Sequence, residues 1–219
     1  MLKFYYDLAS PPVRAVYFTI KHLNIPVEMI NVKLFQGELR TKEYLKINPL
    51  GRIPVVDDGG IILTDSHAIN IYLSTKFEGG DKLYPSDIVR RAIVNQRLFF
   101  DTGELFPSLR HLTKKVALKH STGIDEESLE IFDQGYKGAE NYLQNGKFIA
   151  GDDLTIADFS VASTIASLNI YVPVNKEKYP LLTAYLERAK KWPHYDTIME
   201  PGIEMSRKFL KIMNFALPE

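Results

Sequence analysis

The amino-acid sequence predicts two structural parts, an α/β fold in roughly the first 80 residues and a helical bundle in the remainder. Before residue 80, short apolar runs of the kind found in strands alternate with helical patterns, whereas nearly all of the later sequence has apolar residues at helical spacing. Residues 78–86, between the two parts, are rich in turn-forming residues. We therefore expect one domain over residues 1–80 and a second over residues 88–219.

The first part is predicted to follow the order β-α-β-α-β-β-α. Alternating apolar residues support the first strand, and Asp57-Asp58-Gly59-Gly60 is a strong hairpin signal between the last two strands. This is the order of a thioredoxin-like fold, usually one mixed sheet with helices on both faces. The expected elements are strands at 2–6, 27–32, 53–56 and 61–63, and helices beginning near Ser10, Thr41 and Asp65.

The second part is predicted to be a C-terminal helical bundle. Thr155 and Asp158 have the spacing of a capping box, with Asp in place of the usual Glu, and the helix that they begin carries few charges and should be buried. An interruption of the first helix is expected near Pro107. The expected helices span residues 88–118, 129–143, 155–168, 180–191 and 201–212.

Composition and charge exclude several classes of function. The 219 residues are 45% hydrophobic and 25% charged, which is ordinary for a folded protein. Lys and Arg number 27 and Asp and Glu number 27, so no net positive charge favours nucleic acid or an anionic membrane. The absence of cysteine excludes disulfides, Cys-ligated zinc, a Cys nucleophile and dithiol redox chemistry. We expect no metal, no nucleic-acid or membrane partner and, since no signal segment is recognisable, a cytoplasmic location.

Ser10 is the candidate catalytic residue because of its place in the predicted fold. In redox members of thioredoxin-like folds a cysteine lies where the first strand meets the next helix, and here Ser10 lies there. A thiol handled at this place must therefore belong to the substrate. The N–H groups and partial positive charge of a helix N-terminus, together with the serine hydroxyl, favour a thiolate, and a fall of about 2 in its pKa corresponds to about 2.7 kcal/mol. The alternative is that Ser10 is an ordinary N-cap.

Two further features suit a peptide that carries such a thiol. Proline after Ile53 removes a backbone donor at the start of a strand and permits a cis bond, and a bend there would leave the N–H and C=O of Ile53 to pair with an added strand. Asp65 and Ser66 begin a helix whose N–H groups and hydroxyl suit a carboxylate, while Asp65 suits an ammonium group. Together these residues indicate a site for a zwitterionic thiol peptide. Singly, they are explained as well by an edge-strand proline and by helix caps.

Strings of residues in order along nearly the whole chain resemble the cytosolic glutathione S-transferases, first the insect epsilon class and then the delta class. The combination is specific, although each string alone is not. The matching strings are Ser10-Pro11-Pro12-Val13-Arg14-Ala15-Val16, Asn48-Pro49, Ile53-Pro54-Val55, Asp57-Asp58, Asp65-Ser66-His67-Ala68-Ile69, Leu83-Tyr84-Pro85, Phe100-Asp101-Thr102-Gly103 and Thr155-Ile156-Ala157-Asp158-Phe159-Ser160. The resemblance gives Asp158 a structural role as the cap of the buried helix.

The resemblance implies a dimeric, two-domain enzyme that adds the co-substrate glutathione to electrophiles. It implies that Ser10 stabilises the glutathione thiolate and that the backbone of Ile53 pairs with the cysteinyl part of glutathione. Pro54 matches the family's cis proline. Asp65 and Ser66 match the acid–hydroxyl pair that holds the γ-glutamyl end.

The string Asn48-Pro49-Leu50-Gly51-Arg52 departs from the pattern that the resemblance implies. Gly51 replaces the histidine that usually reaches the glycine carboxylate of glutathione, and Leu39 stands where a second histidine often lies. Arg52 is the residue expected to restore the lost contact by a charge-assisted hydrogen bond. Gly51, Arg52 and His67 complete the predicted set of glutathione-binding residues.

The second substrate is expected to be a hydrophobic electrophile, because the pocket left beside Ser10 would face the helical part. Arg110 is the one charged candidate: either it selects polar electrophiles or it is a solvated surface residue. Aromatic residues at helical spacing are more often core than ligand contacts, which is the alternative for this set. The candidates are Leu34, Phe35, Phe106, Arg110, Phe209 and Met213.

Other functions are compatible with the same fold. A non-catalytic carrier of apolar ligands is suggested by the missing histidine at Gly51, and a glutathione-dependent isomerase would use the same thiolate. Glutathione peroxidase activity is a possible side reaction of the transferase. The homodimer is implied by the resemblance, with residues 68–72 and 90–100 as the segments able to offer a face.

Overall fold

A mixed four-stranded sheet forms the centre of the N-terminal part, with the strands in the order β2-β1-β3-β4. The computed structural model describes residues 1–118 and 121–218. Strand β1 runs parallel to β2 and antiparallel to β3, and β3 runs antiparallel to β4. The thioredoxin-like order is therefore confirmed. The strands are β1 (Leu2–Tyr6), β2 (Val27–Asn31), β3 (Val55–Asp58) and β4 (Ile61–Thr64).

The register of the sheet determines which chain segments meet at one end of it. Tyr5 in β1 is paired with Val55 in β3, and Val55 is paired with Thr64 in β4. The end of β1, the start of β3 and the end of β4 therefore lie at the same end of the sheet. The segments carrying Ser10, Ile53 and Asp65 leave or enter the sheet there.

Strand β3 begins at Val55, so the expected start at Ile53 is wrong by two residues. Proline has no backbone N–H to donate to a neighbouring strand, and Pro54 occupies the position before Val55. The peptide bond between Ile53 and Pro54 is cis. Ile53 therefore lies just outside the hydrogen-bonded ladder.

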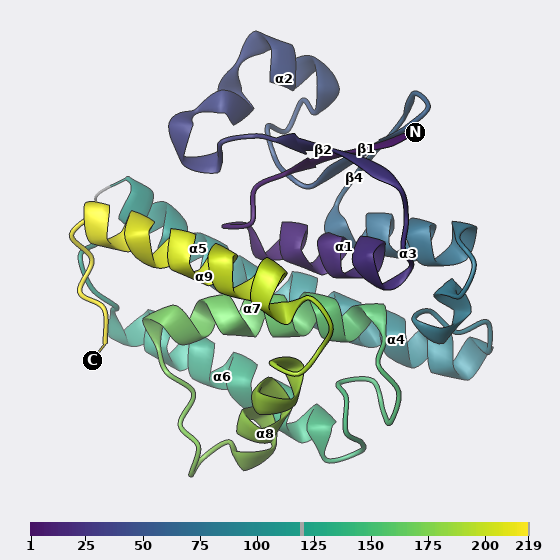
Figure 1. Cartoon of the computed structure of the whole chain (residues 1–219). Helices are drawn as coiled ribbons and strands as arrows, with labels where there is room; N and C mark the ends of the chain where they lie inside the picture. Colours follow the sequence, from purple (N-terminus) through teal and green to yellow (C-terminus); the bar gives the residue numbers. More distant parts are fainter. Residues whose placement is uncertain (119–120, 219) are drawn as a thin grey trace.

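Helices cover both faces of the sheet. Helix α2 lies on one side, and α1 and α3 lie on the other, between the sheet and the helices of the C-terminal part (Figure 1). Apolar side chains of the sheet, α1 and α3 form the N-terminal core. The elements are α1 (Pro11–His22), α2 (Lys42–Ile47), α3 (Ser66–Lys76) and the short 3-10 helices η1 (Leu34–Gln36), η2 (Glu38–Arg40) and η3 (Gly80–Lys82).

The C-terminal part packs around α7 (Ile156–Tyr171), which is buried along nearly its whole length. Helices α4, α5, α8 and α9 contact α7, and α6 packs against α5 and α8 (Figure 1). The other helices are α4 (Ile88–Phe100), α5 (Phe106–Ala117), α6 (Glu126–Leu143), α8 (Pro180–Ala189) and α9 (Tyr195–Ile212).

The predicted capping box begins α7. Asp158 is fully buried, and its Oδ2 accepts the Thr155 N–H at 2.8 Å and the Thr155 hydroxyl at 3.1 Å. Its Oδ1 accepts the Ile149 N–H at 2.8 Å and the Tyr185 hydroxyl at 3.2 Å. Burial raises the pKa of Asp158 to about 6, although these four hydrogen bonds act in the opposite direction. Asp158 thus joins the start of α7 to the loop before it and to α8.

The long helical stretch after residue 88 is interrupted near Pro107, as expected. A π-helical segment, η4 (Asp101–Leu105), follows α4 directly, and Pro107 lies in the first turn of α5. The irregularity therefore lies on the N-terminal side of the proline, where its missing N–H would otherwise have bonded an α-helical carbonyl.

Helix α9 begins at Tyr195, six residues before the expected start at Pro201. The difference arises because proline is typical of a first helical turn, whereas here it lies inside the helix. Buried residues of the first turns, Ile198 and Met199, pack into the core and hold the segment helical despite the lost hydrogen bond. Near the proline, Gly202 lets α9 pack directly against Leu8 and Arg14, where a Cβ would overlap both.

Arg14 links the two parts. Its guanidinium is fully buried, and Nη1 donates to Leu8 O at 2.7 Å and Ala9 O at 3.3 Å. Nη2 donates to Ser163 O at 3.0 Å and to the Ser167 hydroxyl, both in α7. Burial lowers the pKa of Arg14 to about 9. No carboxylate pairs with it among the described residues, so carbonyl and hydroxyl oxygens of both parts solvate this cation.

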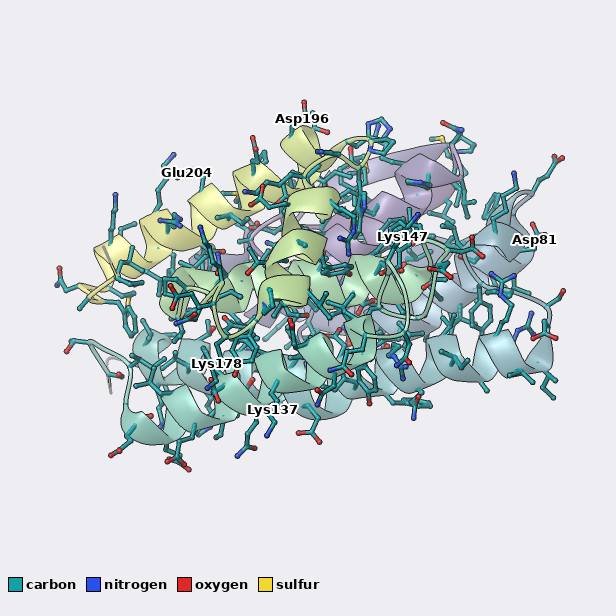
Figure 2. The ribbon with its side chains drawn as sticks, turned by 90° about the horizontal axis from the view of Figure 1, so that it is seen from below. Asp81, Lys137, Lys147, Lys178, Asp196 and Glu204 are labelled. Atoms are coloured by element: carbon teal, nitrogen blue, oxygen red, sulfur yellow. The ribbon has the colours of Figure 1, made fainter. Side chains whose placement is uncertain are left out.

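Several charged side chains lie at the molecular surface. Asp81, Lys137, Asp196 and Glu204 are exposed and project outward from the edge of the molecule (Figure 2). None of the helices within the described ranges combines the length and apolar character needed to span a bilayer.

Candidate functional site

Ser10 has the position expected of a site residue but not the contacts of an ordinary cap. It immediately precedes α1 and is 8% exposed. Its side chain makes no capping hydrogen bond, and no other described residue bonds the hydroxyl. The backbone is held instead, because the Ser10 N–H donates to Asp7 O at 3.0 Å. The hydroxyl is therefore available to a ligand.

The expectation that free N–H groups surround Ser10 is wrong. Pro11 and Pro12 occupy the first two positions of α1 and have no N–H. The next two donors, Val13 N–H and Arg14 N–H, both bond Ser10 O at 3.1 and 3.2 Å. The hydroxyl and the positive end of the helix dipole are what this terminus offers to an anion.

Asp7, which sequence reasoning missed, holds the Ser10 loop against a second loop. It is 2% exposed, and its carboxylate accepts the Ala9 N–H and the Leu34 N–H, each at 3.0 Å. The loop with Ser10 is thus tied to η1, which carries Leu34 and Phe35. The sequence shows an acidic residue at the end of the first strand, but it does not show that Asp7 bonds Leu34, which is distant along the chain.

Ile53 presents unpaired backbone at the same end of the sheet. It is 8% exposed, and neither its N–H nor its C=O bonds another described residue. The preceding loop is held firmly, since the Tyr44 hydroxyl and Asn48 Nδ2 donate to Arg52 O at 2.7 and 2.8 Å. The Arg52 side chain is exposed, and Gly51 is buried with φ +58°. An extended peptide could therefore pair with a rigid edge at Ile53.

Asp65 and Ser66 begin α3. Asp65 has φ +74°, and its Oδ1 accepts the N–H groups of His67 at 2.9 Å and Ala68 at 3.2 Å. Its side chain is 59% exposed, which leaves the other carboxylate oxygen open to a cation. Ser66 is buried, and neither its N–H nor its hydroxyl bonds another described residue. The pair can receive an ammonium group and a carboxylate together.

His67 faces the helical part. Its Nε2 lies 3.0 Å from Asp101 Oδ2, and its Nδ1 lies 3.4 Å from the Thr102 hydroxyl and 3.6 Å from Asp65 Oδ1. Burial opposes the charged ring, but the hydrogen bond to Asp101 and the charges of Asp101 and Asp65 outweigh it and raise the pKa of His67. The described ranges contain no group of three or more acidic and histidine side chains able to hold a metal ion.

The predicted hydrophobic-substrate residues come from three elements. Phe35 of η1 and Phe209 of α9 stack with ring centroids 4.1 Å apart and an interplanar angle of 4°. Phe106 and the exposed Arg110 lie one turn apart on α5, and Met213 follows α9. Leu34 packs partly buried against the N-terminal core. Of the six, Phe35 and Phe209 are thus brought into direct contact, across the junction of the two parts.

Two family models match the chain. The model described as glutathione S-transferase, N-terminal domain, matches residues 4–81, and the model described as glutathione S-transferase, C-terminal domain, matches residues 113–192. The first covers the sheet together with Ser10, Ile53 and Asp65.

Relatives of known sequence or structure match over nearly the full length. Glutathione S-transferase 1 of Manduca sexta is 40% identical over 201 residues, which is 91% of this chain and 92% of that protein. An epsilon-class glutathione S-transferase from the housefly, Musca domestica, is 37% identical with TM-score 0.95, covering 99% of this chain and 100% of that one. A glutathione transferase homologue of Drosophila mojavensis with bound glutathione is 37% identical with TM-score 0.93, covering 98% of each chain.

Proposed function

The chain belongs to the glutathione S-transferase family, in agreement with the epsilon-class resemblance of its sequence, and from this premise we propose the roles of its residues. Residues 1–80 bind glutathione, and residues 88–219 supply the site for a hydrophobic electrophile. Ser10 stabilises the glutathione thiolate, which adds to the electrophile. We place this activity in the cytoplasm.

The unpartnered hydroxyl of Ser10 is the observation that carries the proposal. A buried hydroxyl that does not cap its own helix can donate to a sulfur anion, and the dipole of α1 favours the same charge. Since Pro11 and Pro12 supply no N–H, the hydroxyl is the direct donor. Ser10 therefore acts as a hydrogen-bond donor to the thiolate and takes no proton itself.

The remaining features support positions for the rest of glutathione. The cysteinyl part pairs with the free backbone of Ile53, as an added strand does at a sheet edge. The γ-glutamyl carboxylate meets Ser66, and the γ-glutamyl ammonium meets the exposed oxygen of Asp65. His67 positions this end through Asp101 of η4.

The second substrate enters from the helical part. The Phe35–Phe209 stack and the apolar residues Phe106 and Met213 favour a hydrophobic electrophile such as an aryl halide. The thiol proton leaves to solvent, the thiolate sulfur forms a bond to the ring carbon that carries the halogen, and the halide departs with its bonding electrons. A carbon–sulfur bond thus replaces the carbon–halogen bond, and nothing is oxidised or reduced.

Binding and conjugation by the unmodified protein test this function. We expect isothermal titration to detect glutathione at or below millimolar concentration and the protein to release halide from a chromogenic aryl halide only when glutathione is present. Binding of apolar dyes without measurable glutathione binding would contradict the transferase and support a carrier on the same fold.

We also propose a homodimer built on α4. Its outer face exposes Phe99 (70%) and Ile88 (80%), and Ile62 of β4 is 41% exposed. Large exposed apolar side chains are found at association surfaces, and the family resemblance implies a second copy of the chain as the partner. The α3 residues around Ala68 lie in the same N-terminal layer.

Substitution of Phe99 tests the dimer. We expect the protein to sediment with about twice the mass of one chain and Phe99→Asp to sediment as a monomer at micromolar concentration, because a buried unpaired carboxylate opposes association. Ile212→Asp, at an exposed apolar residue of α9, is the matched control and should leave the mass unchanged. A monomeric unmodified protein, or a dimeric Phe99→Asp variant, would contradict this surface.

A further inference from the structure

Arg40 is distant from Ile53 in the sequence but lies against the loop that precedes Ile53. Arg40 ends η2, and its guanidinium lies on the backbone of Gly51, where Nη1 donates to Leu50 O at 3.3 Å. A Cβ built on Gly51 would lie 2.5 Å from Arg40 Nη1 and 2.7 Å from Leu39 O. Position 51 thus lacks a side chain, and the guanidinium of Arg40 fills the place that one would take.

The support beneath Arg40 is rigid. Gly51 has φ +58°, a conformation suited to glycine, and its N–H donates to Asn48 O at 2.9 Å. Asn48 is 2% exposed, and its Oδ1 accepts the Leu50 N–H at 3.1 Å while its Nδ2 bonds Arg52 O. The loop that contacts the guanidinium is therefore held by a buried side chain.

Arg40 keeps most of its hydrogen-bonding capacity. Its side chain is exposed. Among the described residues it pairs with no carboxylate, and its guanidinium donates to one acceptor, Leu50 O. A guanidinium has five N–H groups in a planar fork that matches a carboxylate. Arg52 is also exposed, but among the described residues no hydrogen bond or ion pair holds its side chain, so a ligand would have to order it at an entropic cost.

We propose that Arg40 binds the glycyl carboxylate of glutathione and that Gly51 makes this possible by leaving space for the guanidinium. This inference rests on the proposed glutathione-binding function and names the receptor for the far end of the peptide. With the γ-glutamyl end at Asp65 and Ser66 and the cysteinyl part at Ile53, the second carboxylate of the peptide needs a cation. Arg40 supplies one that is already oriented, as a forked pair of N–H donors.

Two peptides and two variants test the assignment. γ-Glutamylcysteine carries the same thiol and γ-glutamyl end as glutathione but lacks the glycine. Isothermal titration should show that the unmodified protein binds glutathione about 10- to 100-fold more tightly than γ-glutamylcysteine, as expected for one hydrogen-bonded charge pair. Arg40→Ala should bind the two peptides within about threefold of each other, and Arg40→Lys should lie between.

Arg52→Ala tests the competing assignment, because the sequence predicts this role for Arg52, an exposed arginine that lacks the contact with Gly51. It should keep the preference for glutathione within about threefold of the unmodified value. The proposal is overturned if Arg40→Ala keeps the full preference or if Arg52→Ala abolishes it. If the unmodified protein binds neither peptide, the proposed function fails as well, whereas tight but equal binding of both peptides removes the Arg40 assignment alone. Melting temperatures of the variants should match that of the unmodified protein, since both side chains are exposed.

Discussion

Ser10→Ala should lower conjugation of an aryl halide by roughly 10- to 100-fold at pH 6.5 while leaving the fold intact. Loss of the hydroxyl should return the thiol pKa of bound glutathione most of the way to its ordinary value near 8.5, and each pKa unit corresponds to about 1.36 kcal/mol. Thiolate absorbance of the glutathione complex across pH measures this pKa directly. The activity of Ser10→Ala should recover as the pH rises above 8, because the thiol then ionises without help.

Stability separates this role from that of an N-cap. Because the Ser10 side chain makes no capping bond, Ser10→Ala should change the free energy of unfolding by less than about 0.5 kcal/mol. Asp125 caps α6 by accepting the Ser128 N–H at 2.9 Å, so Asp125→Ala should lower the free energy of unfolding measurably and leave the thiol pKa unchanged. Unchanged turnover in Ser10→Ala, or a stability loss like that of Asp125→Ala, would contradict the assigned role.

Asp158→Ala should destabilise the protein by about 3–5 kcal/mol, the largest stability effect expected of a single side chain here. It leaves the N–H groups of Ile149 and Thr155 buried without an acceptor, at about 1–3 kcal/mol each, and releases the Tyr185 hydroxyl. Urea denaturation followed by circular dichroism measures the change. A loss below about 1 kcal/mol would show that the capping box does not hold α7.

Asp158→Asn should cost less, and its cost should depend on pH. The folded-state pKa of Asp158, about 6, lies above the unfolded value near 3.9, so the folded state retains a proton that the unfolded state loses in between. The stabilisation that comes from this retained proton is therefore complete below about pH 4 and is lost as the pH rises through 6. The deficit of Asp158→Asn should shrink over that window, whereas a deficit that grows would mean that the buried carboxylate is stabilised as an anion.

Local signals predicted the backbone of the fold and the core of the site. Ser10, Ile53 and Asp65 each lie where a strand begins or ends, and turn and cap residues mark such positions in the sequence. Once the strand order is known, the register brings all three to one end of the sheet. The capping box at Thr155 and Asp158 was predictable for the same reason, because its hydrogen bonds join residues three apart.

Contacts between distant segments could not be read from the sequence. The role proposed for Arg40 depends on its position over Gly51. The role of Asp101 depends on its contact with His67, which is 34 residues away in the sequence. The start of α9 was wrongly predicted at Pro201 for a different reason. The sequence does not distinguish a proline in a first turn from a proline inside a helix, and burial of the residues before Pro201 decides between them. Tertiary packing decided each of these cases.

Arg14 has a consequence for recombining such proteins by domain exchange. Its guanidinium donates to carbonyls of the loop before α1 and to α7, so the helical part completes the solvation of a charge that belongs to the N-terminal part. A chimaera that joins the first 80 residues to a foreign helical bundle would retain the cation but lose the acceptors at Ser163 and Ser167. Chimaeras should therefore fold only when the new bundle offers a carbonyl and a hydroxyl at the positions of Ser163 and Ser167. The exchange of domains in this architecture is thus limited by one side chain.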